Sequence, residues 1–180
     1  MSSTWSTVHN AEFNTEMMRR AFAALNRRDL DACTDLMTAN FIINIAEMPY
    51  PKQGLSAWRK HAEMLFAAFP DAQIAIEDIF AVDDKLAVRV RITGTHQGEF
   101  LGTKATGKRI DYRSHEIYRF EGGKLAEEWI CSDMMTLFMQ IGALSKGRII
   151  SMWLSRFRFW FGLGLGGAAG VLVSALILGG

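Results

Sequence analysis

Residues 108–133, KRIDYRSHEIYRFEGGKLAEEWICSD, decide the fold because they encode two strands joined by a tight turn. The stretch Lys108–Phe120 has the two-residue period of a strand that buries one face. Gly122-Gly123 can adopt the positive φ angles that a two-residue hairpin turn needs. Residues 125–133 are therefore predicted to return antiparallel to residues 108–120.

More strands precede this hairpin. Residues 73–82 form a strand-like run, and Asp83-Asp84 marks a turn. In residues 86–93 apolar and mostly polar positions alternate, which predicts a strand with one buried face. Residues 94–109 carry four glycines and are predicted to form a kinked hairpin or loop.

Helical patterns dominate the first part of the chain. Amphipathic spacing predicts helices over residues 10–28 and 55–69, the second stopped by Pro70, with a short helix over 30–37 between them. A strand over 41–45 and a closing helix over 134–144 complete the domain. This order predicts an α+β fold, in which the helices cover one face of a strongly curved, mainly antiparallel sheet. Such a sheet encloses a conical apolar cavity, the usual place for a small molecule.

Composition limits the function classes. The formal net charge is +1, and the folded part shows no basic patch with interleaved aromatics, so we expect no nucleic-acid partner. Cys33 and Cys131 are far apart and match no metal or redox spacing, which favours reduced core cysteines. No His/Cys/Asp/Glu cluster has metal-ligand spacing, so we expect no metal.

The C-terminal segment 159–178, FWFGLGLGGAAGVLVSALIL, has no charged residue. As a helix it would extend about 30 Å, the thickness of the hydrocarbon layer of a bilayer. It is predicted to be a single transmembrane helix. Two alternatives are a buried helix of a larger assembly and an extension that leaves the domain soluble.

Residues 146–158 form a basic, amphipathic linker before this segment, which carries Lys146, Arg148, Arg156 and Arg158. Basic flanks stay on the cytoplasmic side, and the first ten residues lack the features of a secretory signal. We therefore expect a membrane anchor with domain 10–145 in the cytoplasm. Small residues four apart would permit close helix pairing, or they merely fill a low-complexity tail; they are Gly162, Gly166, Gly170 and Ser174.

The soluble part resembles the SnoaL-like polyketide cyclases, or ester cyclases, of the nuclear-transport-factor-2-like superfamily. The matching features keep their order and spacing over nearly half of the chain. They are Phe69-Pro70-Asp71, Gly94-Thr95-His96, Gly98-Glu99-Phe100, Thr106-Gly107-Lys108, Arg119-Phe120, Gly123-Lys124, Glu128-Trp129, Asp133 and Gln140-Ile141-Gly142.

The resemblance implies the conical nuclear-transport-factor-2-like fold, pairing of two copies through the sheet, and ring closure of a small apolar carbonyl or ester substrate by an intramolecular aldol reaction. It implies that this chemistry needs no cofactor. Asp133 matches the family's acid at the end of the last strand, where it acts as general acid and base. Its position also allows a second role, as the N-cap of the helix from Met134.

His115 is the second catalytic candidate, as a donor to the substrate or a partner of Asp133. A two-residue turn places Asp133 opposite Tyr112 and His115 opposite Ile130, on different faces, unless a bulge intervenes. Four side chains predicted on the Asp133 face are candidates for binding substrate: Tyr112, Ser114, Tyr118 and Trp129. Glu116 and Cys131 are predicted to lie on the same face. Trp129 is expected to form pocket wall or core.

Two other histidines are not expected to be catalytic. His96 is predicted to lie at the rim or in solvent, and His61 to be structural. Three functions remain open: a cofactor-free cyclase, a membrane-tethered module that binds a hydrophobic ligand without turnover, and an isomerase, dehydratase or epoxide hydrolase on the same fold.

Overall fold

The computed structural model describes residues 2–155, which fall into two compact units divided between Ala143 and Leu144. The first unit holds all the strands of the described chain and four helices. The helices are α1 (Ser2–Asn26), α2 (Leu30–Asp35), α3 (Leu55–Ala68) and α4 (Met134–Ile141). The strands are β1 (Met37–Ile45), β2 (Lys52–Gln53), β3 (Gln73–Val82), β4 (Lys85–Thr95), β5 (Arg109–Glu121) and β6 (Lys124–Ser132).

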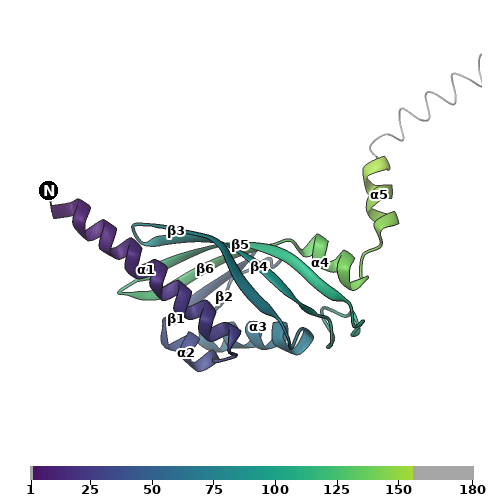
Figure 1. Ribbon diagram of the computed structural model, residues 1–180, viewed down its shortest axis with the longest axis horizontal. Coiled ribbons are helices and arrows are strands. Elements are labelled where there is room, and N and C mark those ends of the chain that lie inside the picture. The colour runs from purple at the N-terminus through teal and green to yellow at the C-terminus, as the bar shows by residue number, and fades with distance from the viewer. Residues whose placement is uncertain (1, 156–180) are drawn as a thin grey trace, which may run out of the picture. The chain divides into compact units, whose positions relative to one another are not determined.

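The strands form one six-stranded sheet in the order β2-β1-β6-β5-β4-β3. β1 runs parallel to β6, and the other neighbouring pairs are antiparallel, so the sheet is mixed. Figure 1 shows α1, α2 and α3 on one side of the curved sheet, with α4 following β6. The α+β architecture predicted from the sequence is confirmed.

The hydrophobic core lies between the sheet and these helices. Alternate residues of β4 and β5 are buried, as the two-residue period predicts. The largest fully buried apolar side chains come from several elements, and they include Phe41, Phe69, Ile43, Leu86, Ile110, Leu125, Leu137 and Ile141. The turn between β5 and β6 has φ angles of 57° at Gly122 and 75° at Gly123, as its sequence predicts.

The predicted register of this hairpin is wrong beyond its first pairs. Phe120 pairs with Leu125, but the register then shifts, so that Arg119 pairs with Glu127 and Ala126 is an extra residue on β6. Leu125 and Ala126 are both buried, which is the signature of a bulge that breaks the alternation. Every later residue of β6 therefore faces the side opposite to the one predicted.

The connection between β4 and β5 packs against the end of α3. The backbone amides of Gln97 and Gly98 donate hydrogen bonds of 2.9 and 3.0 Å to the carbonyl of Ala68. A methyl group at Gly98 would lie 2.1 Å from the carbonyl oxygen of Ala67, so only glycine fits this approach. His96 lies in the same segment and is fully buried, with its Nδ1 3.0 Å from Thr106 Oγ1. The prediction of a rim or solvent position for His96 is therefore wrong.

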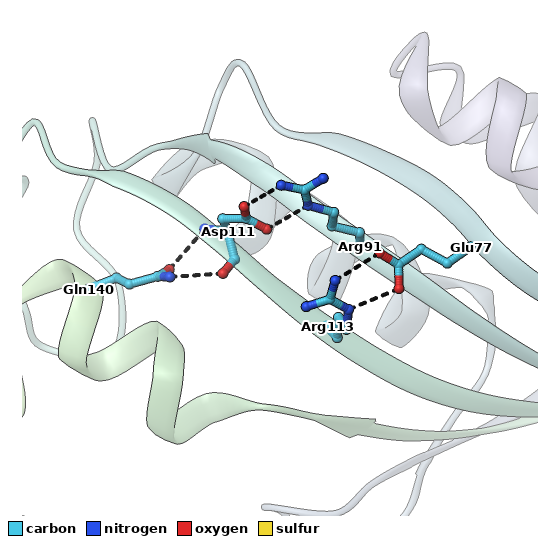
Figure 2. A network of polar contacts seen from close by, with 5 residues as sticks. All are labelled: Glu77, Arg91, Asp111, Arg113 and Gln140. Carbon is cyan, nitrogen blue, oxygen red and sulfur yellow. Dashed lines mark hydrogen bonds and ion pairs between the residues drawn. The ribbon is translucent and has the colours of Figure 1, made fainter.

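The outer face of the sheet carries exposed ion pairs (Figure 2). Arg91 of β4 binds Asp111 of β5, and Arg113 binds Glu77 of β3 at 2.9 Å. The Gln140 amide of α4 exchanges two hydrogen bonds of 2.8 Å with the backbone of Asp111. Exposed ion pairs contribute only about 0.2–1 kcal/mol each. The two hydrogen bonds of Gln140 join α4 to β5.

The second unit is described only as far as the helix α5 (Lys146–Ser155). Three apolar side chains of α5 are exposed: Ile150, Trp153 and Leu154. None of the helices in residues 2–155 is long and apolar enough to cross a membrane. The predicted transmembrane segment 159–178, with its glycine stripe at Gly162, Gly166 and Gly170, lies outside the described residues.

Candidate functional site

A cavity of about 290 Å³ lies inside the first unit. Its lining comes from α1, α3 and the inner face of the sheet and is mostly apolar, with Phe22, Trp58 and Ile92 among its residues. Glu47 and Leu101 line it too and are exposed, so they mark where the cavity meets the surface. Shape and lining are those of a site for a small apolar molecule.

Glu116 and Tyr118 form a hydrogen-bonded pair in this cavity. Both side chains point inward from β5, and the Tyr118 hydroxyl donates a hydrogen bond of 2.6 Å to Glu116 Oε2. Burial raises the pKa of Glu116, and the hydrogen bond from Tyr118 offsets part of that rise. Burial and the charge of Glu116 also raise the pKa of Tyr118, which keeps its proton. A carboxyl with a raised pKa can take up and return a proton near neutral pH.

A second carboxyl, Glu128, lines the cavity from β6. It lies directly across from Tyr118 in the sheet, and its side chain is buried. Burial raises its pKa, and the nearby charge of Glu116 raises it further. The interior therefore holds two acidic groups on neighbouring strands, a combination that can divide proton removal and proton donation between them.

His61 of α3 also lines the cavity. Burial lowers its pKa, with a smaller effect from Lys52, so the ring is neutral at physiological pH. Its Nδ1 atom is buried and has no hydrogen-bond partner among the described residues. The expectation that His61 is purely structural stays untested.

Asp133 lies outside the cavity. It is exposed and caps α4, accepting hydrogen bonds from the Thr136 amide at 2.9 Å and from the Thr136 hydroxyl at 2.6 Å. These bonds, that of the Thr136 side chain first, lower the pKa of Asp133. The capping role proposed from the sequence is thus present, and the exposed Asp133 carboxyl does not line the cavity.

The predicted site residues lie on two faces of the sheet, because β5 alternates and the bulge in β6 turns Trp129 outward. Tyr112, Ser114 and Tyr118 face the interior, where Tyr112 and Tyr118 line the cavity and Ser114 accepts a hydrogen bond of 3.0 Å from Ser132. His115 and Trp129 face the other side and line a groove of about 620 Å³ on the outer face of the sheet. The prediction that Trp129 shares a face with Tyr112 is therefore wrong.

Sequence reasoning missed Glu116 and Glu128 as site residues. Glu116 occupies an inward position of an alternating strand. A charged residue at such a position is rarely buried without a reason, so it could have marked Glu116 as a site residue. Glu128 faces inward only because Ala126 is inserted before it, and nothing in the local sequence marks that insertion. Among residues 2–155 no group of three or more His, Cys, Asp or Glu side chains is placed to hold a metal ion.

Comparison with known families identifies one match. The family model for SnoaL-like polyketide cyclases matches residues 15–141. No curated protein sequence matches the chain.

Several solved structures share the fold. AclR from Streptomyces galilaeus, described as a candidate hydroxylase, is 32% identical, with a TM-score of 0.64 over 72% of this chain and 95% of its own. IdmH from Streptomyces antibioticus, described as a candidate polyketide cyclase, is 27% identical, with a TM-score of 0.63 over 71% of this chain and 96% of its own. A SnoaL-like protein from Jannaschia sp. is 22% identical and shows the fold alone, with a TM-score of 0.70 over 74% of this chain and 94% of its own.

Proposed function

Because the chain belongs to the SnoaL-like polyketide cyclase family, we propose that it is an enzyme that moves protons on a small apolar carbonyl compound inside its cavity, without a cofactor. The reaction proposed is ring closure by an intramolecular aldol step. The apolar lining supports an apolar substrate, and the buried acids support proton transfer as the chemistry.

The observation that carries this proposal is the Glu116–Tyr118 pair. The Glu116 carboxyl is buried in an apolar cavity and bound to a tyrosine hydroxyl at 2.6 Å. The hydrogen bond from Tyr118 orients the Glu116 carboxyl within the cavity that would hold the substrate. A positioned carboxyl of this kind typically accelerates proton transfer by about 10²–10⁴-fold.

The proposed step balances without an added reagent. The Glu116 carboxylate removes a proton from the carbon beside one carbonyl, and the electron pair of that C–H bond forms a new C–C bond to a second carbonyl carbon. The π electrons of that second carbonyl move to its oxygen, and the Glu116 carboxylic acid returns the proton there. The product is the cyclic alcohol, and Glu116 regains its starting state.

Proton removal can be tested before the natural substrate is known. Cyclohexyl methyl ketone is apolar, is small enough for the cavity and exchanges its α-protons slowly in neutral buffer. We expect the full-length protein to accelerate deuterium incorporation from D₂O at these carbons, with a rate that saturates as ketone is added. NMR measures both the exchange and the buffer background.

The main alternative is a binding module without turnover, which the sparse polar lining of the cavity favours. That module would bind the ketone but leave its exchange at the buffer rate, and this result would refute the enzyme proposal. Isomerisation and dehydration begin with the same proton removal, so product analysis on a longer diketone distinguishes them from ring closure.

Two further parts of the proposal concern assembly and location. Pairing of two copies through the outer face of the sheet is supported by two exposed apolar side chains there, Phe80 and Ile117, which line the same groove as His115 and Trp129. Tethering to a membrane by residues 159–178 rests on their sequence alone.

A further inference from the structure

Glu128 is a buried carboxyl with an unpaired oxygen atom. Its side chain is 2% exposed, and its Oε1 atom has no hydrogen-bond partner among the described residues. Leaving a polar group unpaired in the interior typically costs about 1–3 kcal/mol. The same carboxyl lines the cavity, so a bound molecule can reach it.

The neighbours of Glu128 leave it free to act on a ligand. Tyr118 lies directly across from it, but the Tyr118 hydroxyl already donates to Glu116. None of the described residues that line the cavity is a lysine or an arginine, so no fixed cation stabilises a second negative charge. The uncharged form of Glu128 keeps an O–H donor, whereas an isolated buried carboxylate would be very costly.

We propose that the Glu128 carboxyl donates a hydrogen bond to a carbonyl oxygen of the bound molecule, so that the cavity selects neutral carbonyl compounds over amines and carboxylates of the same shape. This inference rests on the proposed function and assigns the second acid of that site. Glu116 acts on the C–H bond, and Glu128 holds the carbonyl oxygen, where negative charge develops as the proton leaves. A donor placed at that oxygen stabilises the charge.

The chemistry of the alternatives explains the selectivity. A carboxylate ligand would bring a negative charge beside Glu116 without a cation to offset it. The ammonium group of an amine would lose its hydration in an apolar cavity, and this cost can exceed the gain from pairing with the Glu116 carboxylate. A ketone requires neither change.

Three ligands of matched shape test this: cyclohexyl methyl ketone, cyclohexylethylamine and cyclohexanecarboxylate. We expect calorimetry on the full-length protein at neutral pH to show the ketone binding at least about tenfold more tightly than either charged analogue. Tighter binding of the amine, binding of the three within threefold of one another, or no binding of the ketone would each overturn the proposal.

Two substitutions separate hydrogen bonding from shape. Glu128→Gln keeps a neutral N–H donor of the same size, and it should bind the ketone within about threefold of wild type. Glu128→Leu removes the donor and should weaken ketone binding by about tenfold, the usual effect of one hydrogen bond. Unchanged binding to Glu128→Leu would overturn the proposal, and the ligand series on wild type decides the matter if that variant does not fold.

This binding assay is independent of the exchange assay. Ketone binding that depends on Glu128 without any α-proton exchange would refute the enzyme proposal and leave the Glu128 assignment standing. Exchange of the α-protons at the wild-type rate in Glu128→Leu would refute the Glu128 assignment and leave the enzyme proposal standing.

Discussion

Glu116→Gln is expected to reduce enzyme-catalysed deuterium incorporation into the ketone by about 10²–10⁴-fold, because it removes the group that accepts the proton. Glutamine has the same size and can still accept the hydrogen bond from the Tyr118 hydroxyl, so the cavity should keep its shape. The loss should therefore appear in the turnover rate with little change in the ketone concentration that gives half the maximal rate. NMR exchange rates at several ketone concentrations measure both quantities.

Tyr118→Phe is the matched control for this variant. It leaves the Glu116 carboxyl in place but removes the hydrogen bond that orients it, so a smaller loss, about tenfold, is expected. Exchange by a folded Glu116→Gln protein within threefold of wild type would show that Glu116 is not the base.

Gly98→Ala is expected to lower the free energy of unfolding of the first unit by about 3 kcal/mol, the upper end of the usual range for overpacking. The added methyl group would lie 2.1 Å from the carbonyl oxygen of Ala67, which belongs to the backbone of α3 and cannot rotate away. To relieve this clash the β4–β5 connection must move, and the movement breaks its hydrogen bonds to Ala68. Urea unfolding followed by tryptophan fluorescence measures the change, because Trp58 is buried in this unit.

Gly147→Ala is the control for this substitution. Gly147 lies in α5 and has no atom within 4 Å of the position that a methyl group would take. Alanine favours a helix over glycine, so this variant should be neutral or slightly more stable. Equal stability of the Gly98→Ala and wild-type proteins would mean that the connection does not pack against α3 as described.

Much of the fold could be predicted because its signals are local. The bounds of β3 at Gln73 and Val82 follow from its composition and the flanking turns, and Pro70 ends α3. The Gly122-Gly123 turn follows from the φ angles that only glycine adopts easily. The parallel pairing of β1 with β6 could not be predicted, because it joins segments about 85 residues apart and depends on how the whole sheet assembles.

The candidate site was less predictable, because one inserted residue decides which side chains face it. Alternation alone placed Trp129 inside the cone and Glu128 outside, and the bulge at Ala126 reverses both. Asp133 matched the family by position and also matched an N-cap, two roles that the sequence cannot separate. The sequence predicts Glu116 on the inner face. It does not predict the contact with Tyr118 that makes Glu116 a candidate base, because that contact depends on how the two side chains are oriented.

The central claim is that proton transfer takes place inside the cavity and not at the end of β6, and the exchange rate of Asp133→Asn tests it most directly. Asparagine is as good an N-cap as aspartate, so the variant should fold while losing the carboxylate. We predict that it exchanges the ketone protons within about threefold of the wild-type rate. A loss of a hundredfold or more in the folded variant would place the chemistry at Asp133 and contradict the account.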